Sequence, residues 1–155
     1  MDTKIEVTNE KSEIAVAIKV AALGMDKLVE TMEAGYPKLM EYIAEQGKQI
    51  SGAPYCCYTN PNEDYSLFDV ELGIPVSEAV VDKDEIFMSQ TYSGKAITGI
   101  HKGAYKDLEN TYVKLMDYAK ENSLELTGVY CDYYLNNPDD VPESELLTKL
   151  VFAIA

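Results

Sequence analysis

The chain has 155 residues, of which 46% are hydrophobic and 26% are charged, a composition typical of a folded globular domain. It carries 13 Lys and Arg residues against 27 Asp and Glu residues, which gives a formal net charge of -14 at pH 7. This acidity argues against nucleic-acid binding, because phosphate contacts need a basic surface, and it disfavours anionic membranes and ligands. We therefore expect a small-molecule ligand that is cationic or neutral, with no nucleic-acid and no membrane partner.

The cysteines and the chain start bear on the compartment. Cys56, Cys57 and Cys131 have no zinc-type spacing, and the single histidine adds little to a metal site. Cys56 and Cys57 are adjacent in a predicted strand, so they point to opposite faces and cannot easily pair. No apolar stretch approaches the ~20 residues of a membrane span, and no secretory signal is visible at the start. We expect a cytoplasmic protein with reduced thiols and without metal or cofactor.

The sequence repeats itself once. A shift of 76 residues places Tyr36-Pro-Lys-Leu-Met-Glu-Tyr on Tyr112-Val-Lys-Leu-Met-Asp-Tyr, and the match continues to Asn60 and Asn136. Nine of the 25 positions are identical, whereas unrelated segments would share roughly one or two. The match extends beyond the helical pattern, which favours a duplicated module over two similar helices.

The first copy is predicted to form a strand, a helix and then two more strands. A β-branched run predicts strand within 4–22, and apolar residues near a period of 3.6 predict a helix over about 25–46. Pro37 lies inside this helix, so we expect a break or kink close to Gly35. Two further strands follow at 50–59 and 66–76, on either side of a turn.

The second copy reads the same way, after a predicted hairpin. Its two arms are 85–92 and 95–101, turning at Ser93-Gly94. A helix is predicted over about 105–122, followed by strands at 126–135 and 147–154 that flank a turn.

These elements predict an α+β fold. A short sheet with one helix leaves an apolar face open, so neither copy should be stable alone. We expect one domain, 1–155, in which a first module of about 1–79 and a second of about 80–155 are related by a pseudo-twofold axis. The two modules would share one largely antiparallel sheet, with two main helices.

Residues of the second copy also carry a family resemblance. Gly103-Ala-Tyr-Lys-Asp-Leu, then Thr111-Tyr112, and the run Tyr134-Leu-Asn-Asn-Pro-Asp-Asp-Val-Pro-Glu-Ser-Glu-Leu-Leu-Thr resemble the GyrI-like small-molecule-binding domains. These are similar to the effector-binding domains of AraC-type and MerR-type regulators. The resemblance covers nearly the whole chain and implies an aromatic pocket between the modules, with a buried acidic residue that meets cationic, lipophilic ligands. Since no residues are left for a helix-turn-helix, the chain looks like a stand-alone member.

Two carboxylates are the candidate catalytic or cation-binding groups. Asp132 lies mid-strand between tyrosines, where relatives commonly have Glu, and burial there would raise its pKa. Glu71 alternates with the apolar residues of its strand. For each, the alternative is a solvated outer face. Relatives often carry a second acid in the last strand, and Lys149 stands at what looks like that place.

Tyrosines are the remaining candidate ligand-binding residues, and twelve are present while tryptophan is absent. Tyr112 matches the helix tyrosine of the family. Strand alternation places Tyr130 and Tyr134 on the side of Asp132, with Cys131 and Tyr133 on the reverse. Tyr55, on another central strand, is included as well. His101 reads as a surface or strand-end residue, because a lone histidine is no metal site.

Three functions remain open. The first is a binding protein for amphipathic, drug-like molecules, which uses the tyrosines and the acidic field. The second, implied by the resemblance, is a hydrolase of electrophilic cyclopropanoid natural products, in which a pocket carboxylate and a tyrosine activate water. The third is an acidic inhibitor of a nucleic-acid enzyme, which the scattered acidic residues disfavour. A homo-oligomer is compatible with each.

Overall fold

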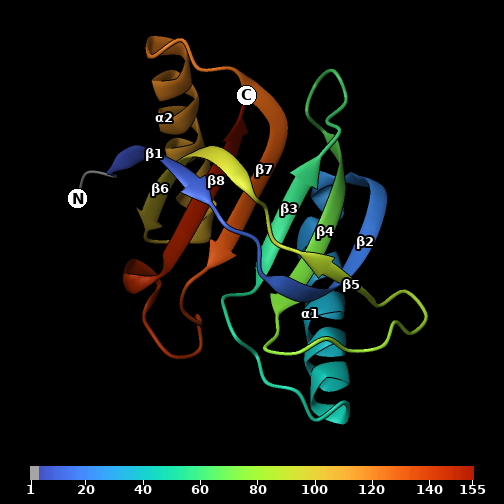
Figure 1. The fold of residues 1–155 in the computed structure, drawn as a ribbon. Coiled ribbons are helices and arrows are strands. Elements are labelled where there is room, and N and C mark those ends of the chain that lie inside the picture. The colour runs from blue at the N-terminus through green and yellow to red at the C-terminus, as the bar shows by residue number, and fades with distance from the viewer. Residues whose placement is uncertain (1–3) are drawn as a thin grey trace.

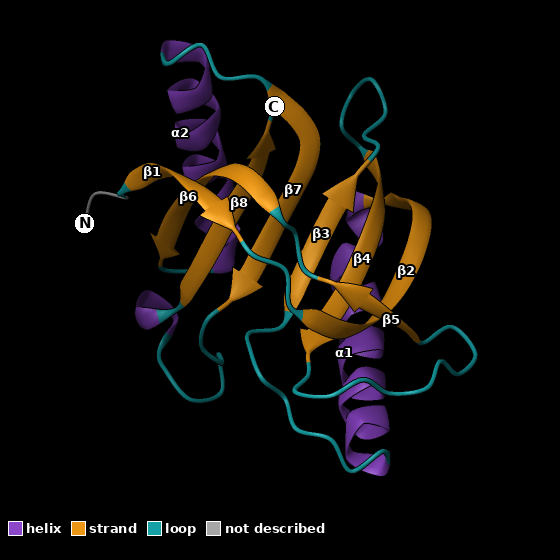
Figure 2. Ribbon diagram, in the orientation of Figure 1, coloured by secondary structure: helices purple, strands orange, loops and turns teal. Residues whose placement is uncertain are grey.

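A computed structural model describes residues 4–155. Eight antiparallel strands form one sheet, and two long helices pack on the same face of it, as Figures 1 and 2 show. The α+β fold class and the shared antiparallel sheet are therefore confirmed. The strands are β1 (Ile5–Glu10), β2 (Ile14–Gly24), β3 (Tyr55–Thr59), β4 (Leu67–Pro75), β5 (Phe87–Gln90), β6 (Gly94–Lys102), β7 (Leu126–Tyr134) and β8 (Leu147–Ile154), and the helices are α1 (Leu28–Glu45) and α2 (Leu108–Glu121).

The sheet order is β1-β6-β8-β7-β3-β4-β2-β5. Apart from the two edge strands, each half of the sheet comes from one copy of the predicted module: β3, β4 and β2 from the first, and β6, β8 and β7 from the second. Helix α1 packs on β2 and β4, and α2 packs on β6. The helix faces that carry Leu39 and Ile43 in α1, and Leu115 and Ala119 in α2, are buried against the sheet. These are the apolar positions at helical spacing, so the amphipathic pattern places each helix.

The two copies meet at the pairing of β3 with β7. Cys56 and Asp132 lie directly opposite each other in this pairing, and the same two residues are separated by the repeat offset of 76. A residue that is both the partner and the repeat equivalent of another must face it across the symmetry axis. The pseudo-twofold axis therefore passes between Cys56 and Asp132.

The predicted hairpin is wrong. Instead of pairing with each other, β5 pairs with β2 of the first copy, and β6 pairs with β1 and β8. The first strand of each copy thus lies at the edge of the other copy. A two-residue Ser-Gly turn favours a hairpin only when nothing else competes, and here the open edges of β2 and β6 compete successfully.

Several predicted boundaries also change. The segment 4–22 is two strands, separated by Lys11, Ser12 and Glu13. Strand β3 begins at Tyr55, since Ile50 makes only an isolated bridge to Val76. Helix α1 runs without interruption through Pro37, so the expected break near Gly35 is absent from it.

One glycine of the sheet is required by packing. Gly73 lies opposite Tyr55 in the β3–β4 pairing, and the Tyr55 ring covers it. A Cβ atom at this position would overlap the ring atoms of Tyr55. Glycine in a strand often marks such a close approach, and here it lets a large aromatic side chain lie flat on the sheet.

The cysteines differ from the prediction of reduced thiols. Cys57 of β3 and Cys131 of β7 form a disulfide, with their Cα atoms 4.1 Å apart, while Cys56 is free and buried. The bond crosses the seam between the two copies. Strand pairing places the two residues opposite each other, which their positions 74 residues apart in the sequence do not reveal.

Candidate functional site

The candidate site lies on the helix-covered face of the central strands, between α1 and α2. Alternation along β7 sends Tyr130, Asp132 and Tyr134 to this face, where the two tyrosines join the helix-side core, while Cys131 packs on the reverse. Helix α1 contributes Tyr36 and helix α2 contributes Tyr112 at the equivalent place in the repeat. Both modules therefore supply aromatic rings to one cluster around Asp132, which we call the helix-face cluster; it comprises Tyr36, Cys56, Tyr58, Tyr105, Tyr112, Tyr130, Asp132 and Tyr134.

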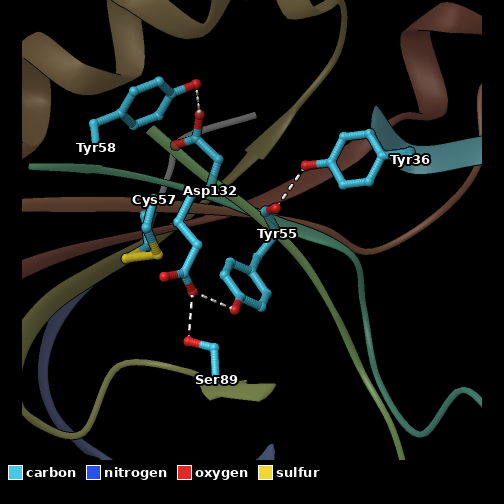
Figure 3. Close-up of a disulfide and its surroundings, with 8 residues drawn as sticks. Tyr36, Tyr55, Cys57, Tyr58, Ser89 and Asp132 are labelled. Atoms are coloured by element: carbon cyan, nitrogen blue, oxygen red, sulfur yellow. Dashed lines mark hydrogen bonds between the residues drawn. A yellow bond between two sulfur atoms is a disulfide. The ribbon is translucent and has the colours of Figure 1, made fainter. Parts of the chain in front are cut away.

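Asp132 is the centre of this cluster and is only 1% exposed. Its Oδ2 atom accepts a hydrogen bond from the Tyr112 hydroxyl at 2.5 Å and a longer one from the Tyr58 hydroxyl at 3.4 Å. Figure 3 shows the Tyr58 hydroxyl pointing at the carboxylate. The Oδ1 atom is buried and has no hydrogen-bond partner. None of the four salt bridges found in residues 4–155 involves Asp132.

Burial controls the ionisation of these groups. Desolvation raises the pKa of Asp132 to about 7, although the hydrogen bonds from Tyr112 and Tyr58 act to lower it. Burial and the nearby Asp132 charge raise the pKa of the Tyr112 hydroxyl far above its ordinary value. The phenols therefore stay protonated as donors, while Asp132 changes charge near neutral pH.

The rings of the cluster pack edge to face. The Tyr134 ring lies 6.4 Å from that of Tyr36 and 5.6 Å from that of Tyr105, and the Tyr130 ring lies 4.8 Å from that of Phe152. Five tyrosines of the cluster are only partly buried: Tyr36, Tyr105, Tyr112, Tyr130 and Tyr134. The Tyr36 hydroxyl donates to the carbonyl oxygen of Tyr55 at 2.5 Å, which ties α1 to β3 (Figure 3).

Glu71 and Tyr55 lie on the opposite face of the sheet. The Oε2 atom of Glu71 accepts hydrogen bonds from the Tyr55 hydroxyl at 2.7 Å and from the Ser89 hydroxyl at 2.8 Å. In Figure 3, Ser89 and Cys57 lie on the other side of the strands from Tyr58 and the Asp132 carboxylate. The structure thus divides the predicted site residues into two groups: Tyr112, Tyr130, Asp132 and Tyr134 on the helix face, and Tyr55 and Glu71 on the open face.

The register clarifies the position of Lys149. Cys57 pairs with Glu71 in the first copy, and Tyr133, its repeat equivalent, pairs with Lys149 in the second. Lys149 therefore occupies the place of Glu71, and it forms a salt bridge with Glu10 at 2.6 Å. The two symmetric positions on the open face carry opposite charges.

Sequence reasoning missed four members of the helix-face cluster: Tyr36, Cys56, Tyr58 and Tyr105. The repeat holds the signal for two of them, because Tyr36 matches Tyr112 and Tyr58 matches Tyr134. His101 is at a strand end, as predicted, but it is buried rather than on the surface. Its ring nitrogens contact the Thr111 hydroxyl at 2.7 Å and the Ala104 carbonyl at 3.0 Å, which fastens β6 to the start of α2.

Two cavities lie away from Asp132. The larger, of about 340 Å³, is next to α1 and is lined by residues such as Ile18, Gly35 and Leu72. The smaller, of about 150 Å³, lies on the open face. Within residues 4–155 no group of three or more His, Cys, Asp or Glu side chains is arranged to hold a metal ion, and neither helix has the length and apolarity that a membrane crossing needs.

Solved structures share this fold. The C-terminal domain of EcmrR is similar over 100% of this chain and 99% of its own, with 19% identity and a TM-score of 0.86. EcmrR in its complex with DNA matches 98% of this chain at 18% identity and a TM-score of 0.83, and the present chain spans only 57% of that longer chain.

More distant structures share it too. SAV2435, solved bound to tetraphenylphosphonium, matches 98% of this chain and 94% of its own at 12% identity and a TM-score of 0.67. A hydrolase from Listeria innocua matches 98% of this chain and 92% of its own at 12% identity and a TM-score of 0.64.

Sequence comparison identifies the family. No functionally curated protein matches this chain. The family model for the GyrI-like small molecule binding domain matches residues 13–155, which is nearly the whole chain and includes every residue of the helix-face cluster. This chain therefore belongs to the GyrI-like small molecule binding domain family.

Proposed function

We propose that this protein binds an amphipathic, drug-like cation in the helix-face cluster, with Asp132 as the counter-charge. The observation that carries the proposal is a carboxylate only 1% exposed, with one oxygen unpartnered and no salt bridge among the described residues. Leaving a buried charge unpaired is costly, so a ligand cation that reaches Asp132 gains more than it would from an exposed acid.

The surroundings of Asp132 suit a lipophilic cation. Aromatic faces attract cations by about 0.5–2 kcal/mol each, depending on how dry they are, and five tyrosines besides Tyr112 belong to the cluster. The net charge of -14 also concentrates cations near the protein. That SAV2435, which shares the fold, was solved with tetraphenylphosphonium supports the choice of ligand class.

Binding requires the cluster to open. Tyr58 and Asp132 are buried, and neither described cavity reaches them. The partly exposed rings of Tyr36, Tyr105 and Tyr134 pack on one another, and we infer that they swing outward to admit the ligand. With the ligand bound, the opened cluster forms the tyrosine-rich pocket between the modules.

The test is calorimetric titration with tetraphenylphosphonium and with triphenylphosphine oxide, a neutral aromatic analogue. At about pH 8, Asp132→Asn should weaken the cation by 30-fold or more, since losing one partner of a desolvated charge pair costs ~2–5 kcal/mol. The neutral compound should bind both proteins alike. Affinity for the cation should fall as the pH drops through about 7, because Asp132 becomes protonated and loses its charge.

Glu71→Gln is the matched control. It removes a carboxylate from the open face and leaves the helix-face cluster untouched, so the affinity for the cation should stay within about twofold. Equal losses for the cationic and the neutral compound in Asp132→Asn would mean that the shape of the site had changed. No loss for either compound would remove Asp132 from the site and contradict the proposal.

A second candidate is hydrolysis of an electrophilic natural product such as a cyclopropanoid. A carboxyl group whose pKa is about 7 is suited to general acid–base work at neutral pH, and the Tyr112 hydroxyl is hydrogen-bonded to it. Asp132→Asn should then abolish turnover while leaving binding of the substrate nearly intact. Glu71, on the other face, would have no part in this reaction, so turnover should survive Glu71→Gln.

We further propose that the protein acts in the cytoplasm, with a small molecule rather than a nucleic acid as its partner. The acidic surface supports this choice of partner, since phosphate groups would be repelled. Association into homo-oligomers is compatible with the proposal and does not alter the site within one chain.

A further inference from the structure

The open face of the sheet has a small cavity that borders the disulfide. Both Cys57 and Cys131 line it, together with Lys19, Glu71, Gln90 and Tyr92 among others. Its volume is about 150 Å³, which leaves room for more than one water-sized group. This space admits a small molecule or the tip of a side chain, but not a folded protein.

The two sulfur atoms differ in access. Cys131 is completely buried, among Ala96, Val151 and Val129, whereas Cys57 is partly exposed. Both cysteines line the cavity, and the greater exposure of Cys57 makes it the one that a nucleophile entering from solvent meets first. Thiol–disulfide exchange depends on such access as well as on the charge state of the attacking thiol.

One cation borders the cavity, beside one carboxylate. Lys19 is exposed and lies opposite Glu71 in the β2–β4 pairing, and Glu71 is already hydrogen-bonded to Tyr55 and Ser89. The Lys19 amine is thus a cation next to the cavity in a protein of strongly negative charge. A nearby cation stabilises the thiolate, which is the reacting form of a thiol.

We propose that Cys57 and Cys131 form a thiol-exchange site, in which a low-molecular-weight thiol enters the open-face cavity and attacks Cys57 Sγ. The small thiols around the protein then determine whether a covalent bond joins β3 to β7, and hence one module to the other. Where a disulfide occurs in a cytosolic protein it is usually transient or redox-sensing, and this bond has the access that such a role needs.

The exchange is balanced by two thiol molecules. The first thiolate forms a bond to Cys57 Sγ, and the electron pair of the broken disulfide passes to Cys131 Sγ, which takes a proton from water. A second thiolate attacks the outer sulfur of the mixed disulfide and releases Cys57 as a thiolate, which is then protonated. The protein disulfide is reduced to two thiols, and the two small thiols are oxidised to one small disulfide.

Cys56 provides a built-in control. It is adjacent to Cys57 but faces the helix-face cluster, where it is fully buried, and burial raises its pKa to about 12. A reagent that reaches thiols only by unfolding the protein would modify both cysteines. A reagent that uses the cavity would modify Cys57 and leave Cys56 unchanged.

The experiment uses the folded protein with cysteine and cystine as probes, read by intact mass and peptide mapping. Excess cysteine should reduce the disulfide without denaturant, so that brief alkylation then labels Cys57 and spares Cys56. In Cys131→Ser, cystine should add one cysteinyl group, at Cys57 alone. Lys19→Glu should slow reduction by cysteine about threefold, the scale of an exposed charge pair, and should change reduction by cysteamine less, because the reacting thiolate of cysteamine has no net charge.

Three results would overturn the proposal. A disulfide that resists cysteine until urea unfolds the protein is a structural cross-link only. Modification of Cys56 at the same rate as Cys57 would show that reaction follows unfolding. If the rate with cysteine does not depend on the charge at position 19, the reaction does not use the cavity. The wild-type measurement decides the first two even if Cys131→Ser folds poorly.

Discussion

Replacing Asp132 by Asn tests the central claim about the site, that the fold holds a desolvated carboxylate. Burial raises its pKa from the ordinary value of 3.8 to about 7. At 1.36 kcal/mol for each pKa unit, this shift amounts to about 4 kcal/mol of folding free energy. Small domains have only about 5–15 kcal/mol in total, so the effect is a large share of the stability.

The direction of the pKa shift decides how the stability of the protein changes with pH. Below about pH 4 the carboxyl group is neutral in both the folded and the unfolded chain, and it has no ionisation cost. As the pH rises from about 4 to 7, the unfolded chain loses this proton first, which favours unfolding. Above about pH 7 both states are ionised, and the full cost of the buried charge is present.

The measurement is urea unfolding of wild type and Asp132→Asn at a series of pH values. The stability of the variant minus that of wild type should rise between about pH 4 and 8 by as much as ~4 kcal/mol, with a slope of up to ~1.4 kcal/mol per pH unit. Taking the difference cancels the many other carboxylates. If burying the Asn amide costs a constant free energy, the plot of the stability difference against pH is displaced, but its slope does not change.

Asp69→Asn is the control with the opposite sign. Hydrogen bonds from the Asn60 side chain and the Ala22 amide lower the pKa of the exposed Asp69 carboxyl, so its stabilisation is present at neutral pH and lost in acid. This variant should therefore be less stable than wild type at neutral pH and approach it as the pH falls. A stability difference for Asp132→Asn that does not vary with pH would refute the claim that the folded protein buries an ionisable carboxylate there.

Three further expectations can be checked directly. Gly73→Ala should lower the free energy of unfolding by about 1–3 kcal/mol in urea, because the new Cβ meets the Tyr55 ring, and a much smaller loss in a Tyr55→Ala background would confirm the cause. Tyr36→Phe should cost about 1 kcal/mol, since it deletes the bond to the Tyr55 carbonyl; an unchanged urea midpoint would show that this bond is absent in solution. Duplex DNA should not shift on a gel with micromolar protein at low salt, because the chain is strongly acidic, and a salt-sensitive shift would contradict this reading.

The fold was largely predictable because its signals are local or repeated. Helical spacing located α1 and α2, and the offset of 76 that relates Tyr36 to Tyr112 indicated the pseudo-twofold arrangement. Alternation correctly placed Tyr130 and Tyr134 on one side of β7 with Asp132. Each of these inferences needs only the positions of residues within one element or one repeat.

What could not be predicted depends on register between strands. Alternation within one strand does not show which of its faces lies on the same side of the sheet as a given face of another strand. The sequence therefore groups Tyr55 and Glu71 with Asp132, although they lie on the opposite face. The Cys57–Cys131 disulfide has the same origin, because the sequence shows three cysteines but not which two face each other. The exchange of β1 and β5 was missed since pairing over long distances leaves no local pattern.

That exchange has a consequence for how the chain folds during synthesis. Ile5 of β1 pairs with Gly99 of β6, 94 residues later, so β1 has no partner until β6 has been synthesised. At ~5–20 residues per second, β1 waits for about 5 to 20 seconds, with its edge open to other chains. Residues Thr8, Asn9 and Glu10, all polar, end this strand and make it a poor template for aggregation during the delay. The second module thus supplies the partner of the first strand, and β1 docks only after β6 has been made.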